Sequence, residues 1–287
     1  MEDLKLGVHT SISGGLTKAI ERASHLGCST LQIFSRNPRG WLAKPLAKEE
    51  LENFRRAHAD SNLAPLVIHA CYLINLAAND QETRHKSVEA FRDEVERAVQ
   101  IGADFLVVHP GATKGASFEE GLDKCCNSIK ESIRGLNLKK LTILIENTAG
   151  QGSSIGCSFN QIKEIVAACN SLPVSVCLDT CHSYASGYNI ATDEGFHQAM
   201  KEIEDSFGFD QIKVVHCNDS KVALGSRVDR HWHIGEGEIG VKGFELLLKE
   251  PRLRKIPLIL ETPIDKLHDD AWNINRIKDI ASYSSIK

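Results

Sequence analysis

The sequence predicts an α/β protein of the (β/α)8 TIM-barrel class, and three observations lead to this prediction. Eight short apolar runs occur along the 287 residues, and each is followed by a helical pattern or by a loop that leads to one. Most runs are continuous stretches of Val, Ile and Leu, which is typical of parallel strands buried on both faces. The length suits eight such units, because barrels of this class contain about 250 residues.

The first expected strand is followed by Gly14-Gly15, which we interpret as the start of a helix. The alternative architecture is a doubly wound open sheet, but no G-x-G-x-x-G follows this strand. The other strands follow at regular intervals. We expect strands at Leu4–Ser11, Thr30–Arg36, Pro65–Ala70, Phe105–Pro110, Leu141–Asn147, Val174–Thr180, Gln211–Asn218 and Pro257–Pro263.

Amphipathic helices are expected between these strands. The clearest pattern runs from Val88 to Val99, with Asn79-Asp80 upstream as candidate caps and Gly102 as a stop. Apolar residues also follow helical spacing over 159–169, and over a shorter stretch from 51 to 57. No linker or shift in composition divides the chain, so we expect a single domain over residues 1–287.

The composition excludes several classes of protein. The net charge of −4 argues against a protein that is basic all over, although bound divalent cations would add positive charge locally. Nine cysteines without a C-x-x-C pair indicate neither a zinc ribbon nor a thioredoxin-like site. No secretory signal follows Met1, and no apolar run approaches membrane length. We therefore expect a cytoplasmic protein with free thiols and no membrane association.

Side chains that can bind a metal ion stand at or just after the ends of six expected strands. Because the carboxyl ends of barrel strands meet at one mouth, these six should face a common centre. Each taken singly is more often a packed core residue, but burying so many ionisable groups without metal would be very costly. The six are His69, His109, Glu146, Asp179, His216 and Glu261.

Three further candidates lie close by in the sequence. His182 follows Asp179 by three residues, and Asp229 and His231 form a D-x-H motif. Imidazole and carboxylate ligands suit zinc, manganese or iron, and nine ligands with one bridging carboxylate would serve three ions. His9 and His233 stay undecided. We expect the remaining histidines to be solvated, namely His25, His58, His85, His197 and His268.

Seven ordered segments surround these candidate ligands. They are His69–Ala77, His109–Gly111, Ile145–Gly152, Cys177–His182, His216–Ser220, Gly225–His231 with Ile234–Gly237, and Ile259–Thr262. Through them the chain resembles, over essentially its whole length, the endonuclease IV family of apurinic/apyrimidinic (AP) endonucleases. No candidate ligand departs from the family pattern.

The resemblance implies a zinc site of three ions, with manganese or iron conceivable at one of them. It assigns His69 and His109 to one ion, and it makes Glu146 the catalytic bridge to a second ion. Asp179, His216 and Glu261 would complete the second ion's ligands, whereas the third ion would be held by His182, Asp229 and His231.

The reaction implied is hydrolysis of the phosphodiester 5′ to an abasic site in double-stranded DNA during base excision repair, by a monomer. The products would be a 3′-hydroxyl and a 5′-deoxyribose phosphate. Zinc lowers the pKa of bound water to about 7, which makes a nucleophile at neutral pH. The same site would remove blocking groups from 3′ ends.

The loops after the second and third strands carry the expected DNA contacts. By resemblance, Arg39 enters the duplex, and Tyr72 and Leu73 fill the gap left by the abasic nucleotide. The alternative for Tyr72 and Leu73 is ordinary packing at the barrel rim. Trp41 fits better as a hydrophobic clasp for its loop. Weaker candidates for phosphate contacts are Arg36, Lys44, Lys221, Arg227 and Arg230.

Three other functions compete with this interpretation. A metal-dependent sugar isomerase or epimerase uses the same barrel but needs only one or two ions. A lyase would act on abasic DNA through a lysine Schiff base. A damage-binding protein without catalysis would not need the full set of ligands.

Overall fold

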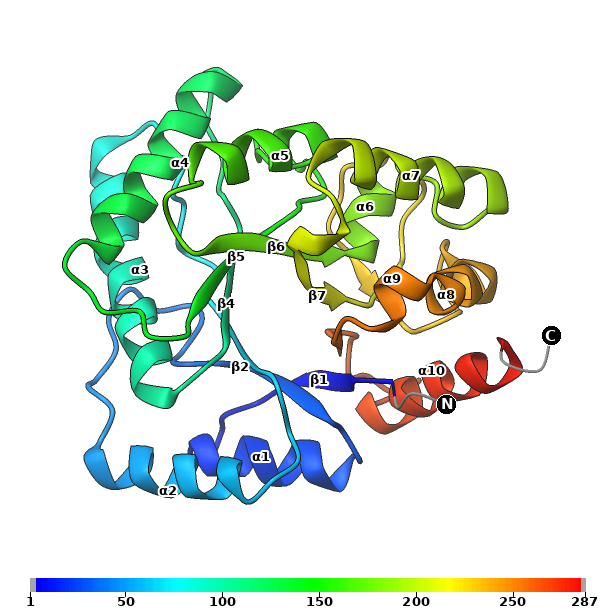
Figure 1. Cartoon of the computed structure of the whole chain (residues 1–287), viewed down its shortest axis with the longest axis horizontal. Coiled ribbons are helices and arrows are strands. Elements are labelled where there is room, and N and C mark those ends of the chain that lie inside the picture. The colour runs from blue at the N-terminus through cyan, green and yellow to red at the C-terminus, as the bar shows by residue number, and fades with distance from the viewer. Residues whose placement is uncertain (1–3, 285–287) are drawn as a thin grey trace.

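The computed structural model describes residues 4–284 and shows a closed barrel of eight parallel strands (Figure 1). Neighbouring strands follow chain order, and the last barrel strand pairs with the first. The predicted (β/α)8 class is therefore confirmed, and all eight predicted strands are present with shorter ends. They are β1 (Leu6–Thr10), β2 (Thr30–Phe34), β3 (Leu66–His69), β4 (Phe105–Val108), β5 (Thr142–Glu146), β6 (Val174–Asp179), β7 (Ile212–His216) and β10 (Leu258–Leu260).

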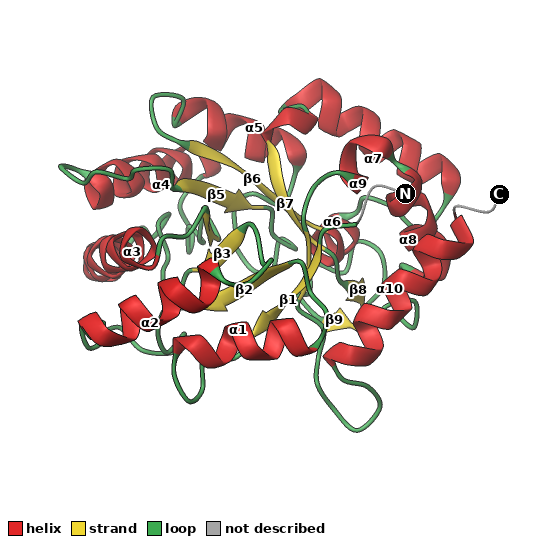
Figure 2. Ribbon diagram, turned by 60° about the horizontal axis from the view of Figure 1, so that its bottom comes forward, coloured by secondary structure: helices red, strands yellow, loops and turns green. Residues whose placement is uncertain are grey.

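Long helices surround the barrel on the outside (Figure 2). The last of them, drawn red in Figure 1, lies beside β1 and completes the ring. The helices are α1 (Leu16–His25), α2 (Lys48–Ala59), α3 (Gln81–Ile101), α4 (Phe118–Ile133), α5 (Phe159–Ala168), α7 (Asp193–Ser206), α8 (Gly240–Lys249) and α10 (Asp270–Ser284).

Several short elements were not predicted. A two-stranded antiparallel sheet, β8 (Asp219–Ser220) and β9 (His231–Trp232), follows β7, and Figure 2 shows this pair outside the ring of barrel strands. The short helices are α6 (Thr180–Ser186), α9 (Pro251–Arg254) and the 3-10 turn η1 (Phe209–Gln211). These segments are too short to show a helical or strand period in the sequence.

The predicted helix boundaries at α3 are confirmed. The Asp80 carboxylate accepts a hydrogen bond from Thr83 N at 2.7 Å, and Gly102 ends the helix with a φ of 90°. A side-chain acceptor at the N-cap and a left-handed residue at the C-terminus are the usual helix ends. Gly15 directly precedes α1, as the Gly14-Gly15 pair predicted.

One apolar layer fills the barrel interior just below the mouth, and it explains where the candidate ligands point. Each of its six residues stands two positions before a strand-end candidate ligand. Because side chains alternate along a strand, residues two apart face the same side, so the six ligands also face inward. The layer consists of Val67, Val107, Leu144, Cys177, Val214 and Ile259.

Two larger apolar clusters fill the space between the strands and the helices and fix the barrel's outer wall. Within residues 4–284, no helix has the length and apolar character that a membrane span requires.

Candidate metal centre

The structure brings the nine predicted ligands together at the mouth of the barrel, in three groups, and a fourth group combines Asp179 and His231 with the buried thiol of Cys181. Within each group the ligand atoms lie within 4.8 Å of one another. Glu146 belongs to two groups: its Oε2 is 2.9 Å from His109 Nε2, and its Oε1 is 3.0 Å from His216 Nδ1. The three groups are His69, His109 and Glu146; Glu146, Asp179, His216 and Glu261; and His182, Asp229 and His231.

Hydrogen bonds on the far side of the imidazole rings fix how these histidines face the centre. In three of them Nδ1 donates to a main-chain carbonyl oxygen at 2.7 to 3.1 Å. A carbonyl oxygen only accepts, so Nδ1 carries the hydrogen and Nε2 keeps a lone pair for a metal ion. These three are His69, His182 and His231.

Gln32 fixes the orientation of the His216 ring in the same way, and the sequence did not predict this role. Its Oε1 accepts from His216 Nε2 at 2.8 Å, which leaves the Nδ1 lone pair of His216 towards Glu146. The Gln32 amide nitrogen donates to Glu261 Oε1 at 2.6 Å. Gln32 is fully buried, and it is in register with His9 on β1. Its inward position on β2 was the only available signal, because an amide is not a typical metal ligand.

His9, which the sequence left undecided, lies beside the second group. Its Nδ1 is 2.9 Å from Glu261 Oε1 and from the amide nitrogen of Gln32. Burial is the largest influence on its pKa and lowers it below the ordinary value. His9 therefore belongs to the surroundings of Glu261 and not to any of the three ligand groups.

The donor set fits divalent cations. His182 Nε2 and His231 Nε2 are buried and lack a hydrogen-bond partner among the described residues. They nevertheless lie 3.3 and 3.5 Å from the two carboxylate oxygens of Asp229. A lone pair that faces a carboxylate oxygen at this distance repels it unless a proton or a metal ion lies between them. The same three ligands would satisfy one ion.

In each of the first two groups, the imidazole side chains favour the charged form of the carboxylates beside them. Burial opposes ionisation of Glu146, yet the nearby imidazoles of His109 and His216 lower its pKa well below the usual value. Glu261 is similar: burial opposes its charge, but His216 above all lowers its pKa. Both groups therefore favour ionised carboxylates facing a positive charge, whether it is carried by imidazole or by metal.

The third group depends on local structure after β6. Asp179 is the last residue of β6 and also the N-cap of α6, where its Oδ1 accepts from His182 N at 2.7 Å. The first turn of α6 therefore carries His182 from the strand end towards the centre. Asp179 Oδ2 is also 3.5 Å from His231 Nε2, so Asp179 connects the second group to the third.

The antiparallel pair β8–β9 supplies His231, and a buried carboxylate holds it in place. Asp219 accepts from Gly235 N at 2.9 Å, Gly237 N at 3.0 Å and Ile239 N at 3.0 Å. A Cβ on Gly237 would lie 2.3 Å from Ser220 O, so this close approach requires glycine. The Gly-Glu-Gly segment therefore closes the chain tightly over β8.

A cleft of about 810 Å³ opens above the ligand groups, and its walls include Arg39, Tyr72, Lys221 and Arg230. Tyr72 is 64% exposed, whereas Leu73 is partly buried and packs on the core. Ordinary packing at the barrel rim, the alternative role for both residues, therefore fits Leu73 better than it fits Tyr72. The cleft places cationic side chains and one exposed aromatic ring around a carboxylate-rich centre.

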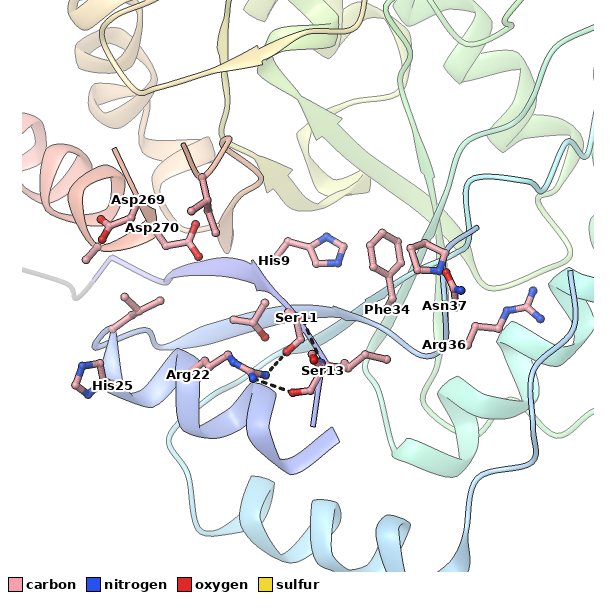
Figure 3. Close-up of a pocket in the computed structure, with 16 residues that line it drawn as sticks. His9, Ser11, Ser13, Arg22, His25, Phe34, Arg36, Asn37, Asp269 and Asp270 are labelled. Carbon is pink, nitrogen blue, oxygen red and sulfur yellow. Dashed lines mark hydrogen bonds between the residues drawn. The ribbon is translucent and has the colours of Figure 1, made fainter. Parts of the chain in front are cut away.

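A second cavity, of about 840 Å³, lies beside this cleft (Figure 3). The loop after β1, α1 and the start of α10 bound it, and His9 and Phe34 line both spaces. Arg22 closes one side by donating to the carbonyl oxygens of Ser11 and Ser13 at 2.6 and 2.8 Å. None of the nine candidate ligands lines this cavity, so it is separate from the candidate metal centre.

The prediction that Arg36 contacts phosphate was wrong. Its side chain is 3% exposed and forms ion pairs with Glu94 at 2.9 Å and Asp93 at 3.0 Å. Two carboxylates of α3 therefore hold the guanidinium inside the protein. Lys44 and Arg227 are exposed but do not line the cleft, whereas Lys221 lines it with its Nζ 3.7 Å from the Trp232 ring centroid.

Two histidines that were expected to be solvated, His58 and His268, differ from that expectation, and the structure also places His233, which the sequence left undecided. His58 Nε2 contacts Leu63 O at 2.7 Å, and His268 stacks on Trp272 with ring centroids 3.5 Å apart. His233 is fully buried, with its Nε2 3.2 Å from Asp265. All three have packing or hydrogen-bonding roles instead of full solvation, and none enters a ligand group.

Comparisons with known proteins agree with this geometry. The family model described as "Xylose isomerase-like TIM barrel" matches residues 20–281. A probable endonuclease 4 from Solibacter usitatus is 43% identical over 281 residues, which cover 97% of each chain. The crystal structure of endonuclease IV from Thermus thermophilus is 35% identical, with a TM-score of 0.86 over 97% of this chain and 99% of that one.

Sugar epimerases share the fold at much lower identity. A 3-keto-D-glucoside 4-epimerase from E. coli is 13% identical, with a TM-score of 0.68 over 98% of this chain and all of that one. A similarity at this level shows the barrel alone and does not distinguish the chemistry.

Proposed function

This chain belongs to the endonuclease IV family and is a DNA-hydrolysing enzyme, and we propose that it is a zinc-dependent AP endonuclease. Its substrate would be double-stranded DNA with an abasic site, cut on the 5′ side to leave a 3′-hydroxyl and a 5′-deoxyribose phosphate. Removal of blocking groups from 3′ ends would use the same centre. The observation that carries the proposal is the sharing of Glu146 between two adjacent ligand groups.

The residues present would hold three zinc ions, one in each ligand group. When bound, zinc would activate water and offset negative charge on the reacting phosphate. Glu146 would hold the first two groups at a fixed spacing, since its two oxygens face His109 and His216. The third group, on α6, β9 and the loop before β9, would hold the ion that offsets charge on the departing 3′ oxygen.

The cleft walls support a DNA substrate. Arg39 and Tyr72 stand on separate loops at the same rim, where a cation and an exposed ring would fill the gap left by a missing base. Lys221 and Arg230 on the opposite wall would contact phosphates. We further propose that the chain acts as a monomer of one domain. Nine free cysteines support a reducing, cytoplasmic location.

A nicking assay tests this proposal. The substrate is a 5′-labelled duplex with one tetrahydrofuran residue, an abasic analogue that cannot form a Schiff base. We expect a single cut on the 5′ side, whose 3′ end a DNA polymerase extends. Prolonged chelation should abolish the cut, zinc should restore it, and elemental analysis of the purified protein should give about three ions per chain. Cutting by metal-free protein, or binding without cutting in zinc-replete buffer, would refute the proposal.

A further inference from the structure

Glu94 on α3 holds the two mouth loops that follow β2 and β3. The residue is 1% exposed, and its Oε2 accepts from Ser35 Oγ at 2.6 Å. Its Oε1 accepts from Arg36 Nε at 2.9 Å and from Cys71 N at 3.1 Å. Ser35 and Arg36 directly follow β2, whereas Cys71 follows β3. One carboxylate therefore fixes the starting points of both loops.

Arg36 extends this contact along the first loop. Its Nη1 donates to Trp41 O at 3.2 Å and to Asp93 Oδ2 at 3.0 Å. Figure 3 shows the Arg36 side chain beside the ribbon of α3, at the edge of the cavity that Phe34 and His9 also line. The middle of the loop is therefore attached to α3 through the same guanidinium that pairs with Glu94.

Arg97, one turn further along α3, holds the end of the first loop. It donates to Ser35 O at 3.4 Å and to Lys44 O, and its Nε donates to Asp93 at 2.9 Å. Together with Arg36 and Glu94, these residues make a balanced set of two cations and two anions. Residues 35–44 are therefore attached to α3 at their start, middle and end.

The tips of the two loops stay exposed above this network. Arg39 and Tyr72 are exposed, and a main-chain bond joins the loops, from Tyr72 N to Pro38 O at 3.1 Å. Burying an ion network is a poor way to gain stability, because apolar residues of the same volume often stabilise as well or better. A fixed arrangement of the attached segments is what such a network supplies.

We propose that Glu94 is a positioning residue that sets the distance between Arg39 and Tyr72 and so controls how tightly an abasic duplex is held. The inference rests on the proposed function, because it assigns these two side chains to the same DNA site. Glu94 touches none of the nine candidate ligands, so it should affect substrate binding and leave the metal centre unchanged.

The test compares Glu94→Ala and Glu94→Gln with the control Val95→Ala. Val95 is fully buried in the core on the same helix, so its truncation costs stability without removing a loop contact. We expect Glu94→Ala to raise KM for the abasic duplex by about 10- to 100-fold, with kcat within about threefold of wild type. Glu94→Gln, which keeps an acceptor but loses the charge, should be intermediate, and Val95→Ala should keep the wild-type KM.

Two further measurements separate positioning from general damage. Metal content and hydrolysis of the small diester bis(p-nitrophenyl) phosphate should match wild type in both Glu94 variants. Amide hydrogen exchange should become faster within 35–44 and 70–75 but not within 142–146. The proposal is wrong if the Glu94 variants keep the same KM as Val95→Ala. It is also wrong if their metal content falls as their KM rises.

If Glu94→Ala does not fold, Glu94→Gln carries the same comparison. If the wild-type protein does not cut the abasic duplex at all, the proposed function fails, while the exchange data still decide whether Glu94 holds the two loops together.

Discussion

The ligand groups at the barrel mouth differ in how the chain builds them. The first two groups stand on strand ends, where the register of β3 to β10 fixes them, and the Glu146 side chain is only 1% exposed. The third group stands on α6 and near the β8–β9 pair, and its Asp229 side chain is 46% exposed. The barrel itself therefore determines two of the three candidate ligand groups, whereas local turns and the Asp219 hydrogen bonds determine the third. The third site should be separable from the other two.

The largest effect should follow from Glu146→Gln, which removes the charge shared by the two strand-end groups without changing the shape of the side chain. We expect kcat to fall by at least about a thousandfold, since metal-assisted charge stabilisation contributes several kcal/mol. DNA binding should change only a few-fold, because the rim loops are untouched. Gel-shift and nicking assays on the same abasic duplex measure both. Wild-type-like turnover would exclude Glu146 as the bridge.

Asp229→Asn tests whether the third group is independent. We expect the bound metal to fall by about one ion per chain and kcat by about a hundredfold, which is less than for Glu146→Gln, because two ions would remain to activate water. Elemental analysis and single-turnover nicking provide the two numbers. Loss of all bound metal would contradict the comparison and show that the three groups form one cooperative unit.

The same difference explains what the sequence could predict. His69, His109, Glu146 and the other strand-end ligands were predictable because their position follows from strand period and barrel closure alone. The local D-x-x-H and D-x-H motifs suggested the third group, but β8 and β9 were missed because strands of two residues have no period. A prediction that failed for a different reason concerned Arg36, whose burial depends on Glu94, 58 residues further along the chain.

Gln32→Ala would sharpen the comparison within the strand-end groups. Without the amide, the His216 ring loses the acceptor that fixes its orientation, and Glu261 loses a donor. Losing such a supporting hydrogen bond typically lowers metal affinity by about 10- to 100-fold. Competition with a chelating dye measures the affinity of the weakest strand-end site, and the third site should be unchanged. A uniform loss at all sites would instead indicate misfolding.

Tyr72→Ala acts above the metal groups and should leave all of them intact. Stacking of a base on an aromatic ring is worth about 1–3 kcal/mol, so we expect the preference for abasic over intact duplex to fall by about tenfold or more. Leu73→Ala is the matched control, because Leu73 packs on the core and should lose stability more than selectivity. Unchanged discrimination in Tyr72→Ala would mean that the ring is only rim packing.

The smallest expected effect is on the free energy of unfolding and concerns Asp270. This partly buried carboxyl shows how much burial destabilises a carboxylate when no cation compensates its charge. No Lys, Arg or His lies within ion-pair distance among the residues described, and burial, with help from Asp269, raises its pKa from 3.8 to about 6. The folded protein therefore binds this proton more tightly than the unfolded chain. Stability is lost as the pH rises from about 4 to about 6, and the full penalty remains above pH 6.

Asp270→Asn should remove that penalty. We expect the free energy of unfolding to rise by about 1–2 kcal/mol at pH 7.5, after allowance for solvent screening of a half-buried group, and to change little at pH 4. Urea titrations at the two pH values measure it. A gain at pH 4 that equals the gain at pH 7.5 would show that the effect is not electrostatic. In that case the contrast with the ligand carboxylates, which imidazoles keep ionised in spite of burial, would lose its basis.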